Sequence, residues 1–216
     1  MTSEIAARVE SAPLVRTNET RCGPRTRAGT PVPPGYLGLL DEVRTLLDLL
    51  GGAVPSAPLV HEATTRIAAL NGALAECQVE EEAQLSGRLV EARGRGQLLI
   101  PPLVVDTVDD TSATGRVVFG RHHLGNGGAV HGGAVPLLFD ELLGRLALVG
   151  GRPRSRTAFL NVDYRSVTPI DRELRVAARV DRVEGRKHFL SGTVHDGERL
   201  CAEATALFVA LRPGQP

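Results

Sequence analysis

Cysteine and lysine are scarce in this sequence, and this limits the kinds of structural and binding site that the protein can form. The three cysteines, Cys22, Cys77 and Cys201, are odd in number and form no CxxC pair. Neither a disulfide framework nor a zinc knuckle is therefore predicted. Lysine occurs once, at Lys187. Nearly all positive charge is therefore carried by arginine, whose planar guanidinium binds phosphate well.

Net charge and long apolar runs are also lacking. The 25 basic and 25 acidic residues cancel, which argues against nucleic-acid or anionic-membrane binding, since both need a basic surplus. No apolar run reaches the roughly 18 residues of a membrane span. The first residues carry charge where a secretory signal has an apolar core. We expect no nucleic-acid partner, no membrane partner and a cytoplasmic location.

The N-terminal part of the chain divides into two regions. Residues 1–36 are rich in proline and glycine and show no periodicity, which predicts an irregular lead-in. Residues 37–50 then place apolar side chains at helical spacing, and a second, weaker helix is predicted from Leu59 to about Glu82. Residues 37–96 are predicted to form a helical extension that is too small for a core of its own. We expect this extension to pack on the rest of the chain.

Residues 97–212 predict a single α+β domain. Strand patterns at 104–110 and 114–123 precede a glycine-rich loop and one long apolar helix. Four further strands are predicted at 156–167, 173–185, 187–197 and 199–211. Short connections, two of them containing glycine turns, join these strands, so neighbours are expected to pair antiparallel. One helix against one antiparallel sheet is an α+β arrangement.

The long apolar helix carries a carboxylate in apolar surroundings. Its apolar side chains, from Val135 to Val149, cover one broad face and part of the opposite one, which predicts burial on two sides. Glu141 has Arg145 four residues later and is predicted to form a surface pair. Asp140 lies on a stripe of small residues without such a partner. Either a distant residue pairs with Asp140, or its carboxylate is available, and a carboxylate against an apolar wall suits general-base work.

The glycine-rich segment GNGGAVHGG, residues 125–133, leads into this helix. Gly132 and Gly133 stand at the helix start, where free backbone N–H groups attract negative charge. Glycine also lets a ligand approach the backbone closely, so Gly128 and Gly132 are candidate substrate-binding positions. A developing oxyanion is expected to bind there. Asp140 of the same chain is one or two helix pitches away, so a second copy is expected to bring its own Asp140 to this turn.

The segment HGGAVPLLFDELLG, residues 131–144, resembles the signature of hotdog-fold thioesterases of the phenylacetic-acid-degradation and acyl-CoA thioesterase 4HBT type. In that family His-Gly-Gly opens the central helix, and an acid follows nine positions after the histidine. The resemblance places the catalytic acid at Asp140. The later segment TAFLNVDYRSVTP resembles the family's next strand, where a Ser or Thr holds the nucleophilic water, and Thr157 is the match. The likeness covers about residues 97–212.

The resemblance implies a cofactor-independent enzyme that hydrolyses an acyl-CoA thioester to free acid and CoA. Two copies would pair, as a homodimer or a dimer of dimers, with sites at their interface. Backbone N–H near Gly133 is expected to bind the carbonyl oxygen, and His131 to orient the carbonyl or support the loop. Asp140 of the partner would activate water or attack directly.

One position departs from the family pattern. Many members carry an asparagine six residues before the histidine; here that position is Gly125, and Asn126 lies one residue late. Asn126 is therefore the candidate for this role. Arg165 is the candidate contact for the CoA phosphates. Other basic residues at strand ends share that chemistry but are usually only solvated: Arg154, Arg156, Arg186 and Lys187.

Alternative functions fit the sequence less well. The histidines at 122, 123 and 131 match no zinc spacing. The glycine run is not GxGxxG, and neither a P-loop nor a GxSxG nucleophile elbow occurs. The related hotdog dehydratases use an acid–histidine pair that is not found here. A non-catalytic acyl-CoA-binding or sensor protein is the remaining alternative, and the acid at Asp140 favours catalysis over it.

Overall fold

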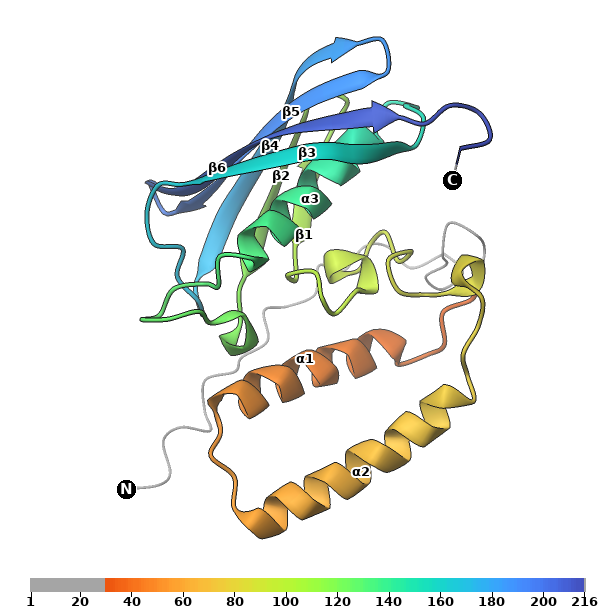
Figure 1. Cartoon of the computed structure of the whole chain (residues 1–216), viewed down its shortest axis with the longest axis vertical. Coiled ribbons are helices and arrows are strands. Elements are labelled where there is room, and N and C mark those ends of the chain that lie inside the picture. Colours follow the sequence, from red (N-terminus) through yellow and green to blue (C-terminus); the bar gives the residue numbers. More distant parts are fainter. Residues whose placement is uncertain (1–29, 216) are drawn as a thin grey trace.

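The computed structural model describes residues 30–215. Most of the lead-in predicted for residues 1–36 lies outside these described residues. Two long helices, α1 and α2, come first, and a six-stranded sheet then curves around a third helix, α3 (Figure 1). The α+β arrangement predicted from the order of strands and helix is confirmed.

The sheet is antiparallel throughout, in the order β1-β2-β4-β5-β6-β3. The pairing expected between consecutive strands is found for β4 with β5 and for β5 with β6, but it is wrong for β3, which pairs with β6 instead of β4. The connection from β3 to β4 spans residues 165–172 and is no tight turn, so it does not hold these two strands side by side. Gly185 and Gly197 have φ of 58° and 60° and sit in the two tight turns that join its central strands, where glycine adopts a positive φ without steric cost. β3 and β1 are the edge strands. The strands are β1 (Val104–Val108), β2 (Ser112–Val118), β3 (Ser155–Tyr164), β4 (Glu173–Glu184), β5 (Lys187–Asp196) and β6 (Arg199–Ala210).

The second strand is shorter than predicted. The sequence pattern extended it through residue 123, but β2 ends at Val118 and residues Arg121–His123 form a short 3-10 turn, η3. The side chain of Asp48, from the distant helix α1, accepts a hydrogen bond from the His122 N–H at 2.9 Å. This tertiary contact bends the chain away from the sheet, and no local pattern reports it.

The core lies between α3 (Ala134–Ala147) and the concave face of the sheet. The broad apolar face predicted for this helix is buried: Val135, Leu138, Phe139, Leu142, Leu143 and Leu146 are at most 1% exposed. Burial of side chains of this size contributes roughly 1.5–3 kcal/mol each. The predicted alternation of β4 is also confirmed, with Leu174, Val176 and Ala178 inward. Leu137 and Leu148, on the opposite side of the helix, are only partly buried in the single chain.

The prediction that Glu141 forms a surface pair is wrong in one respect. The pair with Arg145 exists, with Arg145 Nε donating to the carboxylate at 2.6 Å, but Glu141 is only 2% exposed. The loop that precedes β1 covers this side of α3 and brings a second guanidinium, that of Arg95, to the same carboxylate. Helical spacing identifies neighbours on one helix, whereas burial depends on what the rest of the chain places over it.

The two N-terminal helices differ in how they meet the rest of the molecule. α1 (Tyr36–Gly52) contacts η3 and buries Leu40, so the expected packing on the rest of the chain is found for this helix. α2 (Ala57–Ala75) buries none of its residues and lies beyond α1, on the side away from the sheet (Figure 1). In the described part of the chain, no helix is long and apolar enough to cross a membrane.

The predicted end of the second helix, near Glu82, is wrong, since α2 ends at Ala75. The three acidic residues 80–82 follow, and acidic side chains next to a helix C-terminus are repelled by its negative end. A helix that buries nothing has little tertiary packing to offset such a penalty. Residues Glu81–Ala83 instead form an isolated 3-10 turn.

Candidate active site

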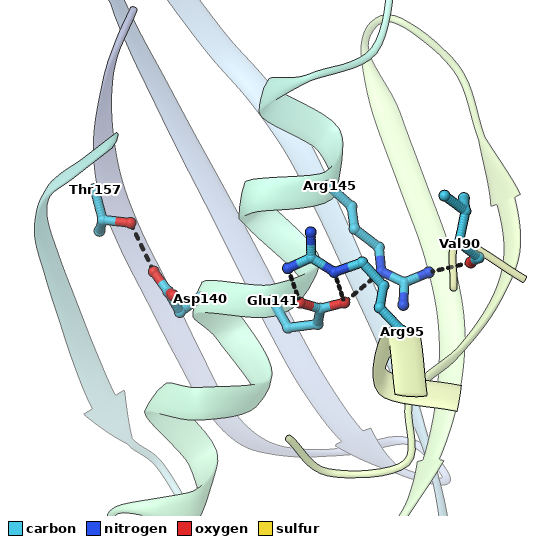
Figure 2. A network of polar contacts seen from close by, with 6 residues as sticks. All are labelled: Val90, Arg95, Asp140, Glu141, Arg145 and Thr157. Carbon is cyan, nitrogen blue, oxygen red and sulfur yellow. Dashed lines mark hydrogen bonds and ion pairs between the residues drawn. The ribbon is translucent and has the colours of Figure 1, made fainter. Parts of the chain in front are cut away.

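Asp140 and Thr157 meet at the edge of the sheet. The Thr157 hydroxyl donates a hydrogen bond of 2.7 Å to Asp140 Oδ1 (Figure 2). Both residues are exposed in the single chain, so Asp140 does not lie in the closed apolar wall that the helix pattern suggested. No ion pair to Asp140 occurs among the described residues. The sequence left open whether a distant residue pairs with Asp140. Its partner is the neutral Thr157 hydroxyl, so no cation among the described residues balances the carboxylate.

The position of Thr157 follows from the register of β3 on β6. Thr157 lies opposite Phe208, whose side chain is buried beneath the sheet. Directly opposed residues of an antiparallel pair share one face, so Thr157 points toward α3. The register shifts between Thr157 and Phe159, and such a bulge re-aims the side chains beside it.

The glycine-rich loop forms a tight turn. The Ala129 N–H donates to the Asn126 carbonyl at 3.0 Å, and the intervening Gly127 and Gly128 have φ of 59° and 79°. Two consecutive positive φ values define a type I′ turn, which strongly favours glycine. These glycines therefore have a conformational role in the turn. The Gly128 carbonyl also accepts a hydrogen bond from the Ile170 N–H at 3.1 Å.

The predicted oxyanion donor is hydrogen-bonded within the chain. The Gly133 N–H donates to His131 Nδ1 at 3.1 Å. The Tyr164 hydroxyl donates to the Gly132 carbonyl at 2.5 Å. Within residues 30–215, the Gly132 N–H has no acceptor. The helix opening is thus an ordered turn in which one amide is free and a second becomes free if the His131 ring moves.

The remaining predicted residues lie apart from the Asp140–Thr157 pair. The side chain of Asn126 makes no hydrogen bond to any residue that the structure describes. Arg165 donates to Glu203 at 2.5 and 2.9 Å, and these bonds raise the pKa of Arg165. The charge of Arg165 is therefore already paired with a carboxylate of the chain. Arginines that form no ion pair are better candidates for binding the CoA phosphates.

Such unpaired arginines line a cavity near the start of β3. The cavity has a volume of about 530 Å³, and its lining includes Arg154, Arg186 and Arg212. Arg186 Nη1 donates to the Ala210 carbonyl at 2.8 Å. None of the three arginines forms an ion pair with a residue in the described range, although most other arginines do. From the sequence, Arg154 and Arg186 are basic residues with the right chemistry for phosphate but are expected to be only solvated, and Arg212 is not predicted.

The structure reveals a buried ion network beside the candidate acid. Glu141 accepts hydrogen bonds from Arg95 at 2.5 and 2.9 Å as well as from Arg145. Asp140 and Glu141 point to opposite sides of α3 (Figure 2). Arg95 also has a left-handed φ of 54°, which is uncommon outside glycine. Helical spacing predicts only the pair of Glu141 with Arg145, whereas Arg95 lies 46 residues from Glu141 and no sequence motif connects the two.

A buried histidine, His123, is the last residue of η3, just before the glycine-rich loop. His123 is 8% exposed, and its imidazole contacts the edge of the Phe119 ring at a centroid distance of 5.4 Å. Burial, then the neighbouring His122, lower the pKa of His123 to about 4. His123 is therefore neutral at neutral pH and serves as part of the packing. Its backbone carbonyl accepts a hydrogen bond of 2.7 Å from the His131 N–H.

Comparison with known proteins shows which family and which relatives this chain resembles. The model of the thioesterase superfamily matches residues 127–203, which include the candidate acid and its hydroxyl partner. Acyl-coenzyme A thioesterase THEM4 of Mus musculus is 38% identical over 99 residues, covering 45% of this chain and 42% of that protein. THEM4 of Bos taurus is 34% identical over 136 residues, covering 62% and 56%. The chain thus spans about half the length of these relatives.

A solved structure extends the comparison to the N-terminal helices. The crystal structure of a thioesterase superfamily protein superposes with a TM-score of 0.71 at 27% identity, covering 82% of this chain and 97% of that one. Residues 97–212 are 116 of 216 residues, so coverage of 82% reaches well into the helical extension. The hotdog fold expected from the resemblance is confirmed. Over residues 127–203 in sequence and over most of its fold, this chain is thus similar to members of the thioesterase superfamily.

Proposed function

We propose that this protein hydrolyses an acyl-CoA thioester to a free acid and CoA, with Asp140 as general base or nucleophile. The Asp140–Thr157 pair carries the proposal. It is an exposed carboxylate held by a hydroxyl and matched by no cation within the described chain. Acyl-CoA is the substrate class because the matched relatives are named acyl-coenzyme A thioesterases.

The chemistry follows from the hydrogen-bonding capacity of the pair. The Thr157 oxygen donates its proton to Asp140 and keeps lone pairs that accept a proton from water. A water held by Thr157 and the second Asp140 oxygen attacks the thioester carbonyl carbon and passes one proton to the carboxylate. The resulting oxyanion collapses, the C–S bond breaks, and the thiolate of CoA takes up the proton. In the nucleophilic variant, the Asp140 carboxylate attacks the carbonyl carbon and the C–S bond breaks to release the CoA thiolate. Water then hydrolyses the mixed anhydride to the free acid, which regenerates Asp140, and the proton released from water is taken up by the thiolate.

The oxyanion is proposed to bind at the glycine turn of a second copy. The free Gly132 N–H is one donor, and the Gly133 N–H becomes the second when the His131 ring turns from it toward the carbonyl. Preorganised donors of this kind are each worth roughly 10²–10³ in rate. Asn126 and Gly128, on the same loop, remain proposed contacts to the thioester side of the substrate.

Pairing of two copies is proposed through the edge strand β3. An unpaired strand edge is a template for another strand, and β3 is exposed along nearly its whole length. Phe159 and Tyr164 on this strand are 47% and 53% exposed. A homodimer through β3, alone or in a dimer of dimers, would cover them and enclose Asp140.

Substitution of Phe159→Lys is expected to convert this homodimer to a monomer and to abolish turnover, because a lysine on an edge strand opposes pairing. Light scattering after size-exclusion chromatography measures the mass. Val108→Lys is the matched control: Val108 is also 47% exposed, on the opposite edge strand β1. A Phe159→Lys protein that stays dimeric would contradict pairing through β3.

The arginine cavity is proposed to bind the phosphate groups of CoA. Arg154 precedes Thr157 by three residues, about 10 Å along an extended strand. The pantetheine arm of CoA separates the thioester from the phosphates by a long flexible chain, which suits a phosphate site set apart from the acid. Arginine is well matched to phosphate because its guanidinium donates two parallel hydrogen bonds.

Replacement of Arg154 and Arg186 together by alanine is expected to raise KM for acyl-CoA by roughly 10²-fold, since hydrogen bonds to charged groups contribute about 1.5–3 kcal/mol each and the lower value is appropriate for exposed side chains. Turnover at saturation should change little. KM for an acyl thioester of N-acetylcysteamine, which has no phosphate, should stay the same. The control is Arg179→Ala, an exposed arginine already paired with Asp181. An equal rise in KM for both substrates would argue against a phosphate site.

Thiol release by the unaltered protein tests the proposed function directly. The protein is mixed with acyl-CoAs of several chain lengths, and free CoA is followed with a thiol reagent. Catalytic release of CoA supports the enzyme. Tight acyl-CoA binding without turnover would overturn it in favour of a non-catalytic binding protein.

A further inference from the structure

Helix α1 contacts the segment that leads into the candidate oxyanion turn. Asp48 lies near the C-terminal end of α1, and one of its carboxylate oxygens accepts the His122 N–H at 2.9 Å. The same oxygen lies 2.5 Å from His122 Nδ1. His122 belongs to η3, immediately before the glycine-rich loop. This contact joins residues 74 positions apart in sequence, and both lie outside the part matched by the family model.

The contact depends on close approach of the two segments. A Cβ added at Gly120 would lie 2.3 Å from the Asp48 carboxylate oxygens, and a Cβ at Gly52 would lie 2.5 Å from the side chain of Arg121. Neither position tolerates a larger side chain without movement. A glycine therefore lies on each side of the contact: Gly52 at the end of α1 and Gly120 immediately before η3.

A chain of hydrogen bonds continues from η3 to the glycine turn. The carbonyl of His123, adjacent to His122, accepts the His131 N–H at 2.7 Å. His131 Nδ1 then accepts the Gly133 N–H at 3.1 Å. On its other side, the loop is held by the Val130 N–H, which donates to the Thr168 carbonyl at 2.8 Å. The position of the turn is thus set by the loop between β3 and β4 from one side and by η3 from the other.

We infer that Asp48 is a positioning residue, which places η3, and through it the His131–Gly133 turn, for the thioester carbonyl. This inference rests on the proposed function. Asp48 touches no reacting atom in this account; it acts through His122 and His123. The N-terminal extension then has a defined task, because α1 supplies one of the two supports of the oxyanion turn.

The experiment combines Asp48→Ala with Gly120→Ala. Asp48→Ala removes the anchor, and Gly120→Ala displaces the Asp48 carboxylate from His122 without removing any polar group, because the added Cβ would lie 2.3 Å from its oxygens. Each is expected to lower kcat about 10-fold and to leave KM for acyl-CoA within about 2-fold, since small misplacement of reacting groups mainly slows the chemical step. The double variant should be no slower than either single variant, because both break the same contact. Glu42→Ala, an exposed acid on the same helix, is the control and should have no effect.

Amide hydrogen exchange reports the coupling independently of turnover. In Asp48→Ala, the His131 and Gly133 amides are expected to exchange at least 10-fold faster, while amides in the middle of α3 keep their protection. If the unaltered protein hydrolyses no acyl-CoA, the proposed function fails, yet the exchange result still decides whether Asp48 orders the turn. Additive losses of kcat, or unchanged exchange at both amides in a folded Asp48→Ala or Gly120→Ala protein, would overturn the inference.

Discussion

Asp140→Asn is expected to lower kcat for acyl-CoA hydrolysis by roughly 10²–10⁴-fold, the usual loss when a general base is removed. The amide still accepts the Thr157 hydroxyl bond of 2.7 Å, so the fold and the pairing of α3 with β3 should persist. An amide cannot take a proton from water at neutral pH and is a poor nucleophile. Steady-state release of CoA at saturating substrate measures the loss.

Two further variants test whether the loss of kcat is specific to the Asp140 carboxylate. Asp106→Asn makes the same change at an exposed aspartate on β1, which is paired with Arg116, and should leave kcat unchanged. Thr157→Ala removes the hydroxyl but not the base, so its loss should be smaller than that of Asp140→Asn. If Asp140→Asn retained more than about a tenth of the activity, another group would have to be the base, and the site assignment would be wrong.

Glu141→Gln is expected to lower mainly the free energy of unfolding, whereas Asp140→Asn lowers mainly kcat. This carboxylate is buried between the guanidinium groups of Arg95 and Arg145 (Figure 2). Removing its charge leaves two cations without their partner, a change that commonly destabilises by about 3–5 kcal/mol at fully buried sites. Arg95 and Arg145 are 32% and 15% exposed, so solvent screens part of the penalty, and we expect about 2–4 kcal/mol.

Urea denaturation followed by circular dichroism measures this change in the free energy of unfolding. Glu173→Gln provides the control, because Glu173 forms an exposed pair with Arg116, and such pairs contribute about 0–1 kcal/mol. Arg95→Gly should fall between the two, since glycine accepts the φ of 54° but removes one of the two guanidinium groups. An unfolding midpoint of Glu141→Gln equal to that of Glu173→Gln would show that the network contributes little to stability.

The two neighbouring carboxylates illustrate how far sequence reasoning reaches. Helical periodicity places Asp140 and Glu141 on different faces, and the structure agrees. Spacing along one helix also finds Arg145 as a partner of Glu141. The partners that decide their roles, Thr157 and Arg95, lie 17 and 46 residues away. Local spacing carries no information about contacts at that separation.

The fold class, the succession of strands and helix along the chain, and the residues of the candidate acid and turn could be predicted from the sequence alone. These follow from short-range rules: two-residue alternation, helical periodicity, glycine turns, and a motif confined to residues 131–144. The sequence also determined that nearly all cations are arginines.

Long-range packing decides the rest: which carboxylate is buried and which is exposed, which arginines remain unpaired, which strand lies beside β3, and that α1 contacts η3 through Asp48. Each of these depends on which distant segments pack together. Charge pairing and burial are set by the sum of such long-range contacts, whereas secondary structure is set mainly by neighbours along the chain.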